Sequence, residues 1–276
     1  MNNVVVRSIS GVVFILAMLA CLMFNKFLFA GLIIFIMSVM LLEFYHITMG
    51  NSYTFSKVLA IIAAIFLFGL LFATASYHIP IRFVAFAMVP IFIVMINSLY
   101  VKDKDEYGKF SNIYTGLLYI AVPIALSNLI AFDKAGNFSG NLLLCFFIII
   151  WCSDVGAFAF GISLGKIFPQ KLFPSVSPKK TWIGFIGGLV SSVLAAFALY
   201  EFGILKFPLI HCLILSFIMS VTGVYGDLFE SQWTRVYGVK DSGKIIPGHG
   251  GFLDRFDSTL MAMPFGAIYL AIFDLL

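Results

Sequence analysis

Residues 57–76 read KVLAIIAAIFLFGLLFATAS, and among these 20 residues only the first, Lys57, carries a charge. A helix needs about 20 mainly apolar residues to cross the hydrocarbon core of a bilayer. Runs of similar character recur along the chain, near residues 8–24, 28–48, 83–101, 111–132, 141–163, 183–200, 208–226 and 257–275. The sequence therefore predicts an all-α, polytopic integral membrane protein with about nine transmembrane helices.

The composition of the whole chain supports this prediction and excludes two other classes of protein. Of the 276 residues, 62% are hydrophobic and 11% are charged, whereas a soluble domain has about 45–50% apolar and about 25% charged residues. So few charges cannot cover a water-soluble surface, and so many apolar residues exclude a disordered chain. We expect a single transmembrane domain over residues 1–276.

The basic residues predict the orientation of the chain, because positive charge gathers on the cytoplasmic side of a membrane. With a cytoplasmic N-terminus, the nine runs place 13 of the 17 Lys and Arg residues inside and 4 outside. The first run follows Arg7 without a small-residue cleavage site, so we expect it to be a retained span. The C-terminus is then expected outside.

Polar residues are concentrated in one part of the chain. Residues 1–150 consist mainly of apolar spans with short connectors, and we interpret them as a scaffold. Residues 151–258 hold most of the polar stretches, and residues 259–276 complete the last span. We therefore expect the chemistry within residues 151–258, on the cytoplasmic side.

The longest polar stretch, residues 226–258, contains five acidic residues. Asp227 follows an apolar run, and an ionisable group at that depth is a candidate functional residue by default. Asp254 and Asp257 are three residues apart, which places both carboxylates on one face of a helix. Such oxygen ligands suit Mg²⁺ together with substrate phosphates. The alternative is a helix start with acids near the positive end of the dipole.

A glycine-rich turn, PGHGG at residues 247–251, lies in the same stretch. Glycines allow backbone N–H groups to approach phosphate oxygens closely. The P-loop pattern is absent, so the turn is either a plain turn or a phosphate cradle between Lys244 and Arg255. His249 could donate a hydrogen bond to phosphate, move a proton or serve a structural role.

A second polar stretch, residues 166–188, includes SPKKTWIGFIGG. Ser177 or Thr181 could cap the helix that follows. Lys179 and Lys180 stand at the entry to that helix, where cations oppose the dipole unless an anion binds there. The alternative is an anchor of the positive-inside type.

Three further polar residues lie within or at the ends of apolar runs. Asp154 stands beside Gly156, Ala157 and Gly161, whose small side chains favour close helix packing. It could pair with a lysine or reach a polar site. Glu43 and His46 lie near the inner end of the second run, where snorkelling to the interface is the expected account.

Several carboxylates, several cations and a glycine-rich turn at a membrane boundary favour phosphoryl or nucleotidyl transfer. Catalysis of such reactions depends mainly on positioning and charge neutralisation, and metal ions can bridge the attacking and leaving oxygens. The membrane setting indicates that one substrate is a lipid.

The motif GDLFES–VKDSGK–PGHGGFLDRFDS, within residues 226–258, closely resembles the signature of the phosphatidate cytidylyltransferase (CDP-diacylglycerol synthase) family. SPKKTWIGFIGG and the segment that begins at Asp154 are similar to the preceding motifs of the family, so the resemblance covers roughly residues 151–258. It implies transfer of a cytidylyl group from CTP to phosphatidate in phospholipid biosynthesis, with Mg²⁺ and a second cation such as K⁺. It also implies a homodimer with a polar cavity that opens to the cytoplasm. A bacterial cytoplasmic membrane is the expected location, and no nucleic-acid partner is expected.

The resemblance also implies roles for individual residues. Asp227 and Asp254 would be the metal-binding pair. The catalytic set would comprise Asp227, Lys240, Asp241, His249, Asp254, Arg255 and Asp257. The substrate-binding set would comprise Ser177, Lys179, Lys180, Ser231, Arg235, Lys244, Gly250 and Gly251.

The sequence departs from the family pattern at two positions. A basic residue usually precedes the equivalent of Arg235, but Thr234 stands here, which could weaken phosphate binding. A Glu often follows the equivalent of Trp182, but Ile183 stands here, which could leave a lysine without its partner. Neither position belongs to the expected metal-binding acids.

Three other functions compete with this interpretation. A CTP-dependent lipid-alcohol kinase would transfer the γ-phosphate instead. A CDP-alcohol phosphotransferase is disfavoured, because its DGxxAR pattern is absent. A secondary transporter would use Glu43, Asp154 and Asp227 as coupling sites, but such proteins often carry polar, broken helices in both halves. Here the polar residues lie mostly in one half.

Overall fold

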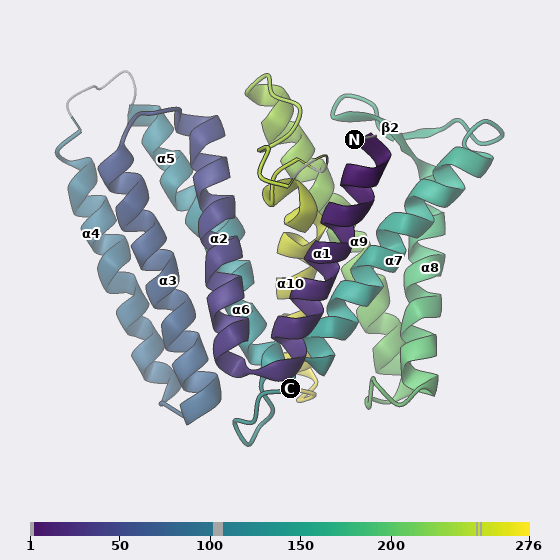
Figure 1. Ribbon diagram of the computed structural model, residues 1–276, viewed down its shortest axis with the longest axis horizontal. Coiled ribbons are helices and arrows are strands. Elements are labelled where there is room, and N and C mark those ends of the chain that lie inside the picture. Colours follow the sequence, from purple (N-terminus) through teal and green to yellow (C-terminus); the bar gives the residue numbers. More distant parts are fainter. Residues whose placement is uncertain (1–2, 102–106, 247, 249) are drawn as a thin grey trace. The chain divides into compact units, whose positions relative to one another are not determined.

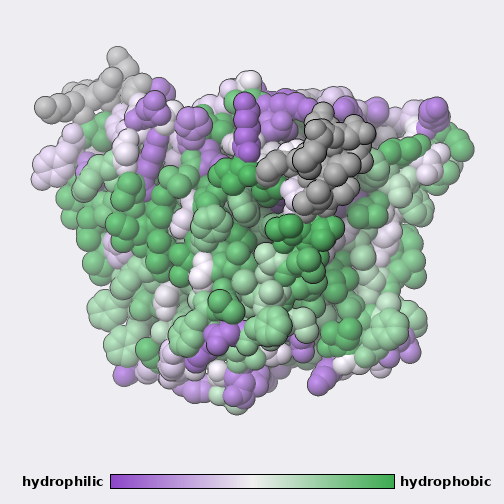
Figure 2. Space-filling view, viewed as in Figure 1, coloured by the Kyte–Doolittle hydropathy of each residue, from purple (hydrophilic) through white to green (hydrophobic). Residues whose placement is uncertain are grey.

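The computed structural model describes residues 3–101, 107–246, 248 and 250–276, with side chains described from residue 10 onward. Nearly all regular structure is helical (Figure 1), and seven helical segments of the described residues are long and apolar enough to cross a membrane. Hydrophobic residues cover the sides of the helices and hydrophilic residues gather at their ends (Figure 2). The prediction of an all-α, polytopic membrane protein is confirmed.

The chain divides into two compact units, which are described separately. Unit 1 comprises Met1–Ser139 and Val239–Arg255, and unit 2 comprises Gly140–Gly238 and Phe256–Leu276. The expectation of one domain over the whole chain stays a prediction.

Unit 1 is built from helices that precede residue 132. They are α1 (Asn3–Phe24), α2 (Lys26–Met49), α3 (Thr54–Tyr77), the 3₁₀ helix η1 (Ile81–Ala87), α4 (Met88–Ser98), α5 (Tyr107–Gly116), the π-helical turn η2 (Leu117–Ala121) and α6 (Val122–Ala131). Helix α3 lies beside α2 and α4 (Figure 1).

The span from α5 to α6 contains the π turn because of a proline. Pro123 has no N–H to donate within the helix, and its ring crowds the preceding turn. The backbone widens just before it, so that the N–H of Val122 bonds to the carbonyl of Leu117, five residues back. Tyr45 of α2 packs against Gly116 in this span and donates a hydrogen bond to the Ile113 carbonyl at 3.0 Å.

Unit 2 contains α7 (Asn141–Leu164), the strands β1 (Lys171–Phe173) and β2 (Ser177–Thr181), α8 (Trp182–Glu201), α9 (Leu209–Val236) and most of α10 (Leu253–Ile272). Helices α7 and α8 pack closely because glycines remove the side chains between them. A methyl group on Gly188 would lie 2.9 Å from the Ser153 carbonyl oxygen, and one on Gly184 would lie 2.9 Å from that of Ala157. The small residues near Asp154 therefore serve the close packing that the sequence indicates.

The antiparallel hairpin of β1 and β2 was not expected from the sequence, and it pairs Lys171 with Thr181 and Phe173 with Ser177. Thr181 ends the hairpin and caps α8, since its hydroxyl oxygen accepts a hydrogen bond from the Gly184 N–H at 3.2 Å. Of the two capping residues considered, Thr181 is confirmed. Ser177 lies within β2 instead.

The candidate spans at both ends of the chain stay predictions. The first run contains the shorter apolar helix Ser10–Phe24, and the last forms most of α10. Neither is among the seven segments that meet the length and composition criteria within the described residues.

Candidate active site

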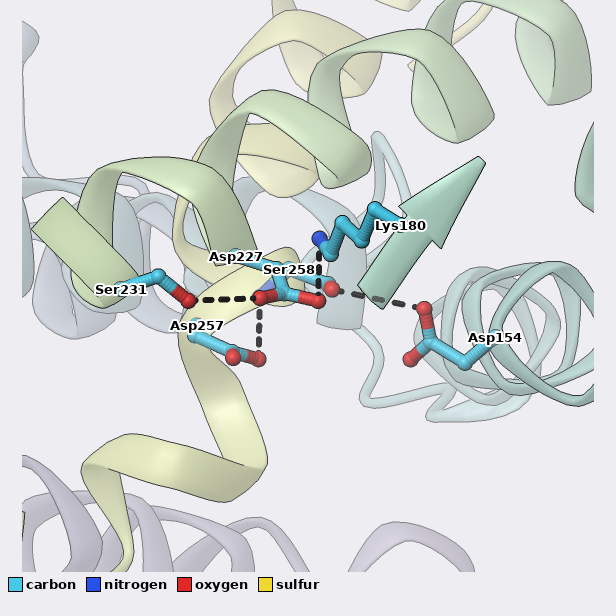
Figure 3. A network of polar contacts seen from close by, with 6 residues as sticks. All are labelled: Asp154, Lys180, Asp227, Ser231, Asp257 and Ser258. Atoms are coloured by element: carbon cyan, nitrogen blue, oxygen red, sulfur yellow. Dashed lines mark hydrogen bonds and ion pairs between the residues drawn. The ribbon is translucent and has the colours of Figure 1, made fainter. Parts of the chain in front are cut away.

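A cluster of polar side chains lies in unit 2 and draws on three helices and the hairpin. We call it the carboxylate cluster, and its residues are Asp154, Lys180, Asp227, Ser231, Asp257 and Ser258 (Figure 3). Three of the six residues are acidic and one is basic, so the carboxylate cluster carries a net negative charge.

Asp227 is in contact with both the hairpin and its own helix. Lys180 of β2 places its Nζ 2.5 Å from Oδ2 of Asp227, and the two side chains are 24% and 33% exposed. Ser231, one turn further along α9, donates a hydrogen bond to Oδ1 of Asp227 at 3.3 Å. Both carboxylate oxygens of Asp227 therefore have a partner, and one of these partners is a cation.

Asp257 enters the carboxylate cluster from α10, and its acidic neighbours are Asp154, Asp227 and Glu230. Its Oδ1 accepts a hydrogen bond from the backbone N–H of Ser258 at 2.6 Å. Gly226 of α9 lets its helix pack against the backbone of Asp257. A methyl group on Gly226 would lie 3.2 Å from the carbonyl carbon of Asp257 and closer still to its carbonyl oxygen. The glycine directly before Asp227 thus brings α9 against the backbone of Asp257 and Ser258 in α10.

Asp154 completes the carboxylate cluster from α7. Its Oδ1 accepts a hydrogen bond from the Ser258 hydroxyl at 3.4 Å, and its side chain is exposed (Figure 3). The sequence suggested that Asp154 pairs with a lysine or reaches a polar site, and the structure places it in a polar site.

The donor chemistry of the carboxylate cluster fits a hard cation such as Mg²⁺. Its potential ligands are carboxylate and hydroxyl oxygens, which Mg²⁺ prefers to nitrogen or sulfur. Among the residues that the structure describes, no group of three or more acidic, His or Cys side chains is arranged to hold a metal. Mg²⁺ commonly takes only one or two protein carboxylates and fills its other positions with water and phosphate oxygens, so a complete protein cage is not required.

A second polar region lies in unit 1, where Asp254 fastens a loop to the start of α10. The backbone N–H of Ser242 donates to both carboxylate oxygens of Asp254, at 2.8 and 3.0 Å. The N–H of Gly251 donates to Oδ2 at 2.8 Å. Asp254 is half-buried and holds together two points of the chain that lie nine residues apart. We call residues 242–253 the anchored loop.

The glycine-rich turn forms part of the anchored loop. Ile246 donates a backbone hydrogen bond to the Gly250 carbonyl at 3.0 Å and closes the turn. Gly248 and Gly250 have φ values of 77° and 86°, which residues with a side chain rarely adopt. A methyl group on Gly250 would also collide with the Asp254 carboxylate. Pro247 and His249 lie outside the described residues, so the role suggested for His249 stays a prediction.

Glu43 of α2 also binds the anchored loop, and this corrects the expectation that its side chain snorkels to the membrane interface. It is only 6% exposed. Its carboxylate accepts hydrogen bonds from the N–H groups of Phe252 and Leu253 at 3.2 and 2.9 Å, and from the Ser242 hydroxyl at 3.4 Å. The nearby His46 is exposed. An acid inside an apolar run was the available signal, but its partners lie about 200 residues further along the chain.

The remaining predicted site residues differ in their unit and in their burial. Asp227 lies in unit 2 and Asp254 in unit 1, so the proposed metal pair stays a prediction. Ser177 and Ser231 are half-buried. The exposed members are Lys179, Arg235, Lys240, Asp241, Lys244 and Arg255, and Gly251 is buried in the anchored loop.

The two departures from the family pattern occupy different environments. Thr234 is 3% exposed, and its hydroxyl donates to the carbonyls of Ser231 and Glu230 at 2.9 and 3.3 Å. A hydroxyl satisfied within its own helix needs no further partner. Ile183 is half-buried in the first turn of α8.

Comparison with known proteins identifies the relatives of the chain. The model of the Cytidylyltransferase family matches residues 5–273. A protein of Bacillus subtilis (strain 168) named phosphatidate cytidylyltransferase is 40% identical over 182 residues, which cover 65% of this chain and 63% of that protein.

Two staphylococcal proteins with the same name share a shorter stretch. The one from Staphylococcus saprophyticus is 44% identical and the one from Staphylococcus aureus (strain COL) is 45% identical, each over 124 residues. Each match covers 45% of this chain and 46% of the relative. The matched stretches thus span less than two thirds of these relatives. The resemblance inferred from the motifs is confirmed at the level of the family.

Proposed function

Because the chain belongs to the cytidylyltransferase family, we propose that it transfers the cytidylyl group of CTP to phosphatidate. The products are CDP-diacylglycerol and pyrophosphate. The observation that carries the proposal is the carboxylate cluster, in which Lys180 pairs with Asp227 beside Asp257, and Asp227 itself lies on α9, a helix long and apolar enough to cross a membrane. The relatives' shared name supports the choice of substrates.

In the proposed reaction, a phosphate oxygen of phosphatidate attacks the α-phosphorus of CTP, and the bond to pyrophosphate breaks. A phosphate monoester has a second pKa near 6, so this nucleophile is largely dianionic at neutral pH. It therefore needs no strong general base. The carboxylate cluster, which contains no His or Cys, suits a reaction of this kind.

The protein must bring two anionic substrates together and accommodate charge on the departing pyrophosphate. We propose that Asp227 and Asp254 hold Mg²⁺, with a second cation such as K⁺ nearby, and that Asp257 and Asp241 support them. A bound Mg²⁺ would neutralise phosphate charge. Lys180 lies at the edge of the carboxylate cluster, where its ammonium group can bind a phosphate oxygen.

The exposed basic residues Lys179, Arg235, Lys240, Lys244 and Arg255 are proposed to bind the phosphates of CTP and pyrophosphate. Ser177, Ser231 and His249 would complete the polar pocket. The N–H groups of the glycine-rich turn would contribute to the same binding.

The multi-pass membrane character rests on the apolar helices. We further propose that the protein is a homodimer in a bacterial cytoplasmic membrane with its active site facing the cytoplasm. The bias of basic residues supports this orientation. Membrane lipid is then the source of one substrate.

The test uses purified protein in detergent with phosphatidate, Mg²⁺ and CTP labelled at the α-phosphate. We expect label to enter the lipid phase, and we expect EDTA or the Asp254→Asn variant to prevent it. Labelled lipid from γ-labelled CTP and a lipid alcohol, with none from α-labelled CTP, would replace this proposal with the kinase. Uptake of substrate into sealed proteoliposomes without any labelled lipid would favour a transporter.

A further inference from the structure

Glu43 is a buried acid to which the proposed reaction gives no role. It lies in α2, whose other residues are mostly apolar, and it is 6% exposed. Burying a carboxylate is costly unless hydrogen bonds or opposite charges compensate it. The partners that compensate Glu43 all belong to the anchored loop.

Two of these partners are the N–H groups of Phe252 and Leu253, at 3.2 and 2.9 Å. Leu253 is the first residue of α10, and the first N–H groups of a helix have no acceptor within it. The carboxylate of Glu43 thus caps α10 from a different helix. Its negative charge also complements the positive end of the α10 dipole.

The third hydrogen bond comes from the hydroxyl of Ser242, at 3.4 Å from Oε2 of Glu43. The backbone N–H of the same residue is bound by Asp254. Glu43 and Asp254 therefore hold the two ends of the anchored loop between them. Glu43 accepts hydrogen bonds from Ser242 and Phe252, while Asp254 accepts hydrogen bonds from Ser242 and Gly251.

Two glycines allow the loop to pass directly over the Glu43 carboxylate. A methyl group on Gly251 would lie 2.6 Å from each of its oxygens, and one on Gly243 would lie 2.8 Å from its carboxyl carbon. The backbone thus fits against this side chain at both ends of the anchored loop.

We propose that Glu43 is a positioning residue, which fixes the two ends of the anchored loop and through them the orientation of Asp254. This inference deepens the proposed function and rests on it for its link to CTP. Glu43 itself would touch neither substrate, because its carboxylate is buried and bonded to the loop.

The test compares Glu43→Gln with the wild-type protein by hydrogen exchange in detergent. Glutamine has nearly the same size, but its amide group offers only one acceptor oxygen, so one of the two backbone donors loses its partner. We expect amides of residues 242–253 to exchange about tenfold faster, the size expected for losing one hydrogen bond to a charged group. Peptides from α3, in the same unit, should exchange as in the wild type. His46→Gln and Glu201→Gln are matched controls, since both residues are exposed and outside the site.

A double-mutant cycle then separates positioning from general loss of structure. Glu43→Gln should weaken CTP binding about tenfold in the wild-type background but less than twofold in the Asp254→Asn background, because the effect passes through Asp254. Equal losses in the two backgrounds would overturn the positioning role. Unchanged exchange in residues 242–253 would overturn the anchoring itself. If the wild type forms no labelled lipid, the proposed function fails, while the exchange measurement still decides whether Glu43 anchors the loop.

Discussion

The ammonium group of Lys180 and the carboxylate of Asp227 lie 2.5 Å apart, which joins the β-hairpin to a long apolar helix. Both side chains are partly open to solvent, at 24% and 33%. An ion pair of this exposure contributes little to stability, because water and salt screen it. We infer that the pair is present for the chemistry of the site.

Asp227→Asn tests this inference most directly. We expect cytidylyl transfer to fall at least ~100-fold, because the variant removes the negative charge with which Asp227 is proposed to hold Mg²⁺. The midpoint of thermal unfolding in detergent should shift by only a few degrees. Glu201→Gln, an exposed acid at the end of α8, serves as the matched control. Near-normal turnover by purified Asp227→Asn would refute its assignment to the metal site.

Lys180→Met tests the cation of the pair. We expect the KM for CTP to rise about tenfold or more, since a phosphate oxygen loses a charged donor, with little effect on stability. Lys171→Met is the matched control, because Lys171 lies exposed on the other strand of the hairpin. The two variants are compared by steady-state kinetics at several CTP concentrations. Equal effects of the two substitutions would show that only the general positive charge of the hairpin matters.

Gly250→Ala tests the glycine-rich turn. The positive φ of 86° disfavours alanine, and the new methyl group would displace the carboxylate of Asp254. Gly203→Ala offers a matched control, because its φ is 68° but a methyl group there meets no atom within 4 Å. We expect both variants to lose about 1–2 kcal/mol of stability from backbone strain. Only Gly250→Ala should also lose CTP binding, as measured by titration calorimetry.

Gly226→Ala tests the close approach of α9 to Asp257 of α10. The methyl group would collide with the Asp257 backbone, so we expect a loss of about 1–3 kcal/mol from overpacking. Turnover should fall as Asp227 and Asp257 move apart. At Gly223, one turn earlier, a methyl group would make ordinary contacts, the nearest at 3.6 Å. Gly223→Ala should therefore fold and react normally, and a similar loss in both variants would contradict this account.

The spans could be predicted from the sequence because hydrophobicity acts locally. The run 57–76 falls within α3, and the run 141–163 within α7. The cap at Thr181 was also predictable, since its acceptor and donor are three residues apart. The hairpin before it was missed, because its strands are only three and five residues long and Thr181 is the only buried residue in them.

Asp227 and Asp257 were predictable as candidate residues, because both lie in the polar stretch 226–258, and the structure places both in the carboxylate cluster. The environment of Glu43 was not, because the N–H of Leu253 that it binds lies 210 residues further along the chain. Periodicity and spacing describe neighbours in sequence. The hydrogen bond between Glu43 and Leu253 joins residues far apart in the sequence, so it depends on how unit 1 folds.

The same separation has a consequence for synthesis of the protein. A ribosome that adds about 5–20 residues per second needs about 10–40 s to proceed from Glu43 to Leu253. Throughout that interval, α2 carries an acid whose final donors do not yet exist. The nascent chain must keep this carboxylate hydrated, protonated or held by another partner until translation delivers the loop. The final packing of α2 is therefore a late event in biogenesis, although this helix is synthesised long before the loop that binds it.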